Sequence, residues 1–230
     1  MSGTWKPRSL TGGATSPVNE INSVFAKISS KNYVPLRDKM LTITILEDPE
    51  TEEAISSPGV EIRDTELMKP VVDAFMRNLK LLNDNSPVIE IYTNMFIDMK
   101  KGWKGRHGKI LEKLFNRELE ISIREYTKKE EKEVKDNLEI YTLAKFIGLL
   151  YDKGEVPGLY VMKVLEIFYG TNINSLNVVA RLLRVIISKL KTDPFFKAKL
   201  EKKYRTLLDS QMHSHGGSLK FLIEDVFKEW

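Results

Sequence analysis

The chain has 230 residues, of which 42% are hydrophobic and 9% aromatic, a composition that can bury a sizeable globular core. It contains no cysteine, which excludes disulfides, thiolate metal sites and cysteine nucleophiles. The net charge of +4 is a small excess of 36 basic over 32 acidic residues, so charge alone leaves contact with nucleic acid open. The sequence has no run of about 18 apolar residues and no secretory signal pattern. We therefore expect a cytoplasmic protein, with the nucleus as the alternative, and no membrane partner.

The first part of the chain divides into a leader, two helices and a loop. Residues 1–16 are rich in Gly, Ser, Thr and Pro and predict a flexible leader, which leaves residues 17–230 as a single domain. Helical periodicity begins at Pro17 and resumes in a second helix from about Asn32. The next segment, "LEDPETEEAISSPGVEIRD" (46–64), contains two prolines and five glutamates and predicts a long acidic loop.

The rest of the chain continues the helical pattern, and strand-like alternation is nowhere convincing. A helix is predicted over residues 65–84, with Pro70 tolerable only close to its start. The segment "KKGWKGRHGK" (100–109) predicts a loop because it holds three glycines among basic residues. We predict an all-α fold of about ten helices, stacked as antiparallel hairpins in a HEAT-like solenoid. The remaining helices are predicted from residue 86, from residue 110, and over residues 138–152, 157–169, 175–191, 193–214 and 217–230.

The helix predicted over residues 138–152 is apolar on two sides, which predicts that it is sandwiched between neighbouring helices. It carries Gly148 in its middle, where glycine costs about 1 kcal/mol relative to alanine. We expect another helix to approach so closely at Gly148 that a Cβ atom would collide with it. Gly154 is expected to end the helix in the left-handed conformation, and Pro157 to start the next one.

Six segments carry a resemblance to a known family. "KFIGLLYDKGEVP", "LYVMKVLEIFYG" and "NSLNVVARLLRVIISKLKTDPFF" together resemble the central signature of the middle domain of eukaryotic translation initiation factor 4 gamma. "INSVFAKISSKNYVPLRDKMLTI", "SPVIEIYTNMFIDMKK" and "SLKFLIEDVFKEW" resemble other helices of that domain and occur in its order. Leu149 stands where the family has a glutamate and Ser218 where it has an arginine, so the chain is identified as a divergent member.

The resemblance implies a crescent of HEAT-like hairpins that acts as a scaffold without catalysis or cofactors. Members of the family grip a DEAD-box RNA helicase of the initiation factor 4A type through two separate surfaces, and some also bind RNA. One of these surfaces corresponds to "PGVEIRDTELM" in this chain. The helicase-binding residues implied there are Val60, Ile62, Arg63 and Asp64.

The basic segment 100–109 suggests a second kind of contact, on the basis of its own residues. Cationic side chains around a tryptophan can neutralise phosphates while the indole stacks on a base of single-stranded RNA. Its glycine spacing does not match a phosphate-binding P-loop. The alternative is a solvated loop between helices. The candidate RNA-binding residues are Lys100, Lys101, Trp103, Lys104 and Arg106.

Other chemistry finds little support in the sequence. His213 and His215 lie two residues apart, but without a third histidine or a cysteine they form at best part of a metal site. No Ser-His-Asp arrangement or dinucleotide-binding glycine pattern stands out, so we expect neither an enzyme nor a cofactor. Two alternatives to the helicase scaffold remain. One is an adaptor for a poly(A)-binding or cap-binding protein, and the other is a helical repeat that binds single-stranded RNA directly.

Overall fold

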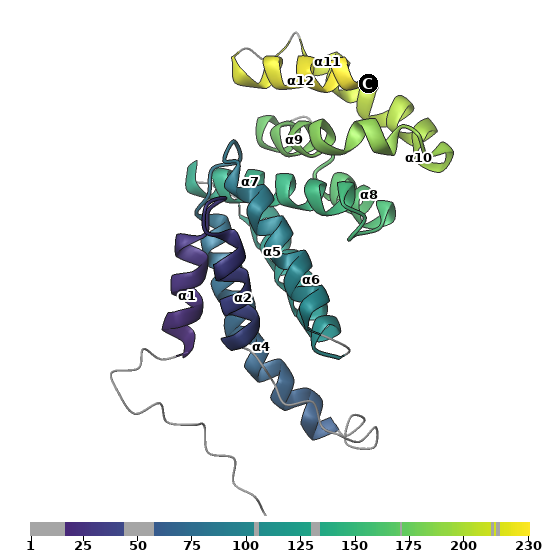
Figure 1. Ribbon diagram of the computed structural model, residues 1–230. Helices are drawn as coiled ribbons and strands as arrows, with labels where there is room; N and C mark the ends of the chain where they lie inside the picture. The colour runs from purple at the N-terminus through teal and green to yellow at the C-terminus, as the bar shows by residue number, and fades with distance from the viewer. Residues whose placement is uncertain are drawn as a thin grey trace, which may run out of the picture.

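The computed structural model describes residues 17–43, 58–103, 106–129, 134–170, 172–212, 214 and 217–230. Within these residues all regular structure is helical and there is no β-strand, which confirms the predicted all-α fold (Figure 1). The predicted leader, residues 1–16, lies outside the described residues, as does most of the predicted acidic loop.

The first half of the chain forms a bundle, drawn from purple to teal in Figure 1. α1 packs on α2 and α4, α2 packs on α5, and α6 packs on both α4 and α5. The helices of this half are α1 (Pro17–Lys27), α2 (Tyr33–Ile43), α4 (Pro58–Lys80), α5 (Val88–Gly102) and α6 (Arg106–Lys128).

The second half continues the stack on one side of this bundle, with α7, α9 and α12 lying one above another in Figure 1. α7 contacts α4, α5 and α6 of the first half as well as α8 and α9, so it joins the two halves. The elements of this half are α7 (Val134–Asp152), α8 (Gly158–Ile167), α9 (Ile173–Leu190), α10 (Pro194–Lys199), the π-helical segment η1 (Leu200–Arg205), α11 (Thr206–Met212) and α12 (Ser218–Glu229).

A cluster of four phenylalanines forms the centre of the core where the first half meets α7. Phe75 of α4, Phe96 of α5, Phe115 of α6 and Phe146 of α7 are all buried. The ring centroids of Phe96 and Phe115 lie 4.4 Å apart, and those of Phe115 and Phe146 lie 5.5 Å apart. Because each ring comes from a different helix, this one cluster fixes four helices against one another.

Both glycine predictions for α7 are confirmed. A Cβ atom on Gly148 would lie 2.9 Å from the Cβ atom of Val185, so α9 approaches the α7 backbone more closely than any other residue would allow. Gly154 has a φ of 79°, in the left-handed region that favours glycine. At Gly148, side chains of α9 therefore pack directly against the backbone of α7.

The structure corrects two predictions about α4. The helix begins at Pro58, so residues 58–64 are helical and not part of a loop. Pro58 at the first helical position costs no hydrogen bond, because the N–H group it lacks has no partner there. Pro70 lies in the interior of the helix and not close to its start. The burial of Val71, Phe75 and Leu79 after it offsets the hydrogen bond that the proline ring removes.

The predicted helix 193–214 is interrupted by the π-helical segment η1 between α10 and α11. Asp193 caps the helix start, where its side chain accepts a hydrogen bond of 2.9 Å from the Phe195 amide. Lys199 of α10 and Lys203 of η1 both form ion pairs with Glu166 of α8, and the Lys199 ammonium lies 2.7 Å from the Glu166 carboxylate. These contacts attach the final helices to the middle of the stack.

Candidate functional site

The four residues implied to bind a helicase lie in the first turns of α4. Val60, Ile62, Arg63 and Asp64 all fall within Pro58–Lys80, while their side chains lie outside the described part of the structure. Residues three and four apart share a helix face, so positions 60, 63 and 64 belong to one face and position 62 to another. The helix thus groups three of the four positions, and their role in binding stays a prediction.

The basic segment 100–109, which we predicted to be a loop, is largely helical. Lys100 and Lys101 belong to the last turn of α5 and Arg106 begins α6, while Lys104 lies outside the described residues. The tight junction explains Gly108, where a Cβ atom would lie 2.4 Å from the carbonyl oxygen of Lys100. The two helices therefore fold back on each other with little room between their ends.

Acidic side chains engage the lysines at the end of α5. The Lys100 ammonium lies 3.0 Å from Glu112 of α6 and 3.2 Å from Glu155, and Lys101 lies 3.6 Å from Glu155. Burial lowers the pKa of Lys100, but the hydrogen bonds to Glu112 and Glu155 outweigh burial and the net pKa is raised. These lysines tie α5 to α6 and to the turn before α8. No local pattern in the sequence indicates these ion pairs, because Glu155 lies 55 residues from Lys100.

Trp103 packs into the core and is only 7% exposed. Its indole offers no open face for a base to stack on, so the arrangement in this structure does not support the role that we predicted for the ring. RNA binding by Lys100, Lys101, Trp103, Lys104 and Arg106 stays a prediction, and it would require the indole to leave its place in the core.

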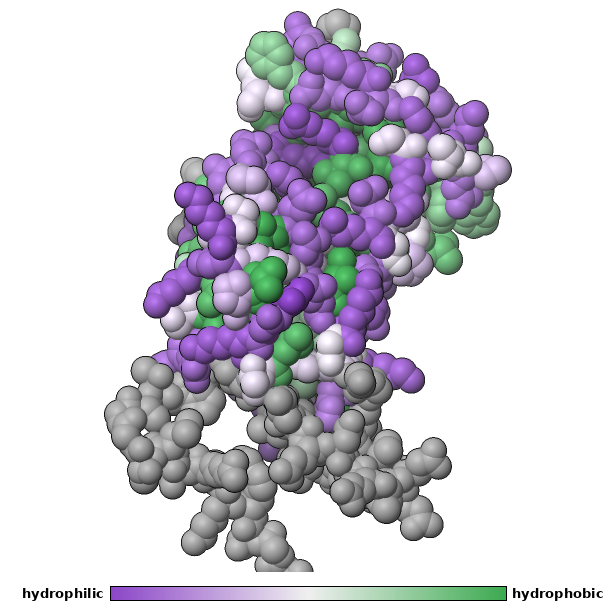
Figure 2. Space-filling view, viewed as in Figure 1, coloured by the Kyte–Doolittle hydropathy of each residue, from purple (hydrophilic) through white to green (hydrophobic). Residues whose placement is uncertain are grey.

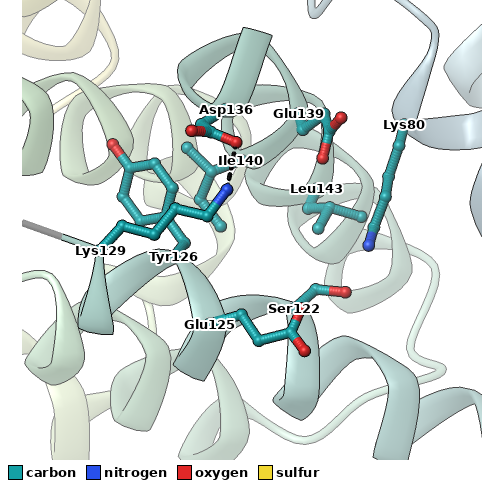
Figure 3. A pocket seen from close by; sticks show the side chains of 9 residues that line it. All are labelled: Lys80, Ser122, Glu125, Tyr126, Lys129, Asp136, Glu139, Ile140 and Leu143. Carbon is teal, nitrogen blue, oxygen red and sulfur yellow. Dashed lines mark hydrogen bonds and ion pairs between the residues drawn. The ribbon is translucent and has the colours of Figure 1, made fainter. Parts of the chain in front are cut away.

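A small cleft lies where the ends of α4 and α6 meet α7 (Figure 3). Its volume is about 40 Å³, room for about one water molecule. Lys129 pairs with Asp136 at one end, and Lys80 extends between Glu139 and Glu125 at the other. The lining residues are Lys80, Ser122, Glu125, Tyr126, Lys129, Asp136, Glu139, Ile140 and Leu143. The cleft is lined by both lysines and carboxylates, so its charges are balanced by the protein's own side chains. We interpret it as a polar contact region between helices and not as a ligand site.

The surface in Figure 2 is mainly hydrophilic, with apolar atoms gathered at the right-hand edge over α8 and α10. Leu159 on α8 is 65% exposed and Phe195 on α10 is 74% exposed. Exposed large apolar side chains of this kind occur at protein interaction surfaces.

Comparisons with known proteins do not identify the chain. No protein-family model matches it, and no curated protein matches it. The described residues contain no group of three or more His, Asp or Glu side chains that could hold a metal ion, and His213 and His215 lie outside them. None of the helices in the described ranges is both long and apolar enough to span a membrane.

Proposed function

We propose that the chain is a non-catalytic helical scaffold of translation initiation or a related step of mRNA metabolism. It binds and activates a DEAD-box RNA helicase of the initiation factor 4A type. One observation supports this proposal above the others. The segments that resemble the initiation factor domain form α1–α2, α5, α7–α9 and α12, and each of these groups contacts the next in that order. The resemblance thus follows a continuous path of packed helices from one end of the stack to the other.

The proposed mechanism is a shift between helicase conformations. A rigid scaffold that binds the closed or half-open helicase more tightly than the open form raises the population of the active conformation. The size of the shift is limited by the difference between the two affinities. A scaffold held together by shared aromatic packing, as at Phe75, Phe96, Phe115 and Phe146, suits this role because it resists deformation by its partner.

The test is size-exclusion chromatography of the chain mixed with an initiation-type DEAD-box helicase, with and without an ATP analogue and single-stranded RNA. Co-elution and a higher helicase ATPase rate are expected. The double variant Ile62→Asp with Arg63→Glu should lose both. The matched control is Leu81→Asp with Arg77→Glu, which makes an equivalent pair of changes at two exposed positions, one in the last turn of α4 and one directly after it.

The outcomes separate the partner from the surface. Separate elution in every nucleotide state would refute the helicase proposal. Co-elution of the double variant with the helicase would support the helicase as the partner and refute the binding surface at the start of α4. Recovery of a poly(A)-binding or cap-binding protein without any helicase would instead favour the adaptor alternative.

A further inference from the structure

A hollow of the described structure is lined by residues of α7, α9 and α12, which are stacked in Figure 1, and by the turn that follows α4. Its volume is about 390 Å³, within the range of pockets that bind small ligands or single side chains. We call it the Lys145 pocket. It is lined by Asp84, Asn85, Lys145, Arg181, Arg184, Val185 and Leu222.

Asp84 organises one wall of the Lys145 pocket. Its carboxylate accepts a hydrogen bond of 2.7 Å from Nε of Arg181, and its backbone carbonyl accepts one of 2.7 Å from Nζ of Lys145. The Arg181 guanidinium also lies 4.2 Å from the ring centroid of Tyr141 and donates to Asn177. Both cations are therefore held in place before any ligand arrives, which lowers the entropy cost of binding.

The pocket holds more positive charge than its own carboxylate can balance. Three cations line it, and the Asp84 carboxylate is engaged by Arg181. Among the described residues, no carboxylate lies within 4.0 Å of the Lys145 ammonium, whose one hydrogen bond goes to a neutral carbonyl. Burial lowers the pKa of Lys145, and the more distant carboxylates of Asp84 and Glu90 do not offset it. An anion in the pocket would supply the missing interaction.

Arg184 stands at the edge of the Lys145 pocket with donors to spare. Its side chain is 52% exposed, and one of its terminal nitrogens lies 3.2 Å from Asp225 of α12. A guanidinium has five N–H donors, so this contact leaves others free to bind a second carboxylate. Arg184 can therefore close over a group that has entered toward Lys145.

The surroundings favour one isolated negative group over a polyanion. Asp225 lies beside Arg184, and Glu90 interacts electrostatically with Lys145, so the pocket has acidic neighbours on α12 and α5. These carboxylates repel a nucleic-acid backbone, which carries a charge at every nucleotide. Val185 and Leu222 give the pocket an apolar side that suits a methylene stem. We propose that the Lys145 pocket binds the carboxylate side chain of an acidic residue of a protein partner. This site is separate from the start of α4, and it stands whether or not the partner is a helicase.

The proposal can be tested by an NMR titration of backbone amides and arginine Nε–H groups at constant ionic strength. The probe is N-acetyl-glutamate amide, and N-acetyl-glutamine amide is the uncharged control. We expect saturable shifts at Asn85, Val185 and the Arg184 side chain with the glutamate probe alone. Lys145→Gln and Arg184→Gln should each weaken binding about tenfold, the effect of losing one charge-assisted hydrogen bond. Lys135→Gln, an equal charge change at an exposed position on α7, should leave it unchanged.

Several results would overturn the proposal. Equal shifts with the glutamine probe would show that charge is not recognised. Unchanged affinity in Arg184→Gln would show that the probe does not bind in the pocket. This variant is informative even if Lys145→Gln fails to fold, because the Arg184 side chain is half exposed. Inorganic phosphate saturating the same signals at lower concentration would reassign the pocket to phosphate groups. A single-stranded RNA oligonucleotide displacing the glutamate probe would reassign it to nucleic acid.

Discussion

α7 and α2 show two different ways in which a helix is held in this protein. α7 contacts five other helices, and apolar residues along most of its length are buried, including Leu143, Phe146, Ile147 and Leu150. α2 contacts α1 and α5, and Met40 is the one buried residue among its described side chains. The central helix is thus fixed by packing on all sides, while the peripheral helix depends on a narrow apolar contact.

Polar contacts partly compensate for the smaller apolar contact of α2. The Tyr33 hydroxyl donates a hydrogen bond of 2.7 Å to Asp98 of α5, and Arg37 lies 3.4 Å from the same carboxylate. Lys39 forms an ion pair of 2.8 Å with Glu20 of α1. Such contacts at a surface each contribute little, so α2 should open more readily than α7.

The largest effect is expected from Phe146→Ala in α7. The substitution removes a ring that packs on Phe75, Phe96 and Phe115 and leaves a cavity shared by four helices. The free energy of unfolding should fall by about 3–5 kcal/mol, measured by urea denaturation. A fall below about 1 kcal/mol would mean that α7 is not the centre of the core.

Gly148→Ala should produce an intermediate effect. The new Cβ atom would meet the Cβ atom of Val185 at 2.9 Å, and that atom cannot move without the backbone of α9. We expect the free energy of unfolding to fall by about 1–3 kcal/mol.

Gly102→Ala is the matched control, because its new Cβ atom would meet only the side-chain end of Leu41 in α2, at 2.8 Å. Leu41 is partly buried and can shift, so the control should change stability by less than about 1 kcal/mol. Equal losses of stability in Gly148→Ala and Gly102→Ala would show that the contact at α2 is as rigid as the contact between α7 and α9.

The smallest effect is expected from Tyr33→Phe in α2. It removes the hydrogen bond to Asp98 and leaves the ring in place, so the loss should be about 1 kcal/mol. Amide hydrogen exchange should become faster in α2 and stay unchanged in α7, because only the peripheral helix is loosened. Tyr169→Phe, at a half-exposed ring, serves as the control. Faster exchange throughout the chain would show that α2 and α7 open together.

The sequence allowed the helices themselves to be predicted because apolar spacing reports directly on the buried face of a helix. Gly154 is predictable because it meets a local backbone requirement, and Gly148 because a glycine in mid-helix indicates the close approach of another helix. The start of α4 was missed because residues 58–64 are mostly polar or turn-forming and show no apolar stripe. Pro70 was misplaced because its cost is offset by tertiary packing, which local pattern does not contain.

The candidate sites were harder to predict, since they depend on residues far apart in the chain. The sequence predicts that Lys100 and Lys101 are available to a ligand, because Glu155 is distant in sequence although it is close in space. Likewise, the bond from Lys145 to Asp84 joins residues 61 apart, so the Lys145 pocket has no signature in any single segment. The glycines and lysines around Trp103 predict a ring that is open to a base, although the fold buries it.

The π-helical segment Leu200–Arg205 can tolerate the loss of one residue. Its hydrogen bonds span five residues where an α-helix spans four, so the segment accommodates one residue more than an α-helix between the same ends would need. We expect a deletion of one residue there to let an α-helix form while α10 and α11 keep their orientations. A deletion elsewhere in a helix rotates every later side chain by about 100°. This segment is thus the place in the final helices where sequences that differ in length by one residue can share the same fold.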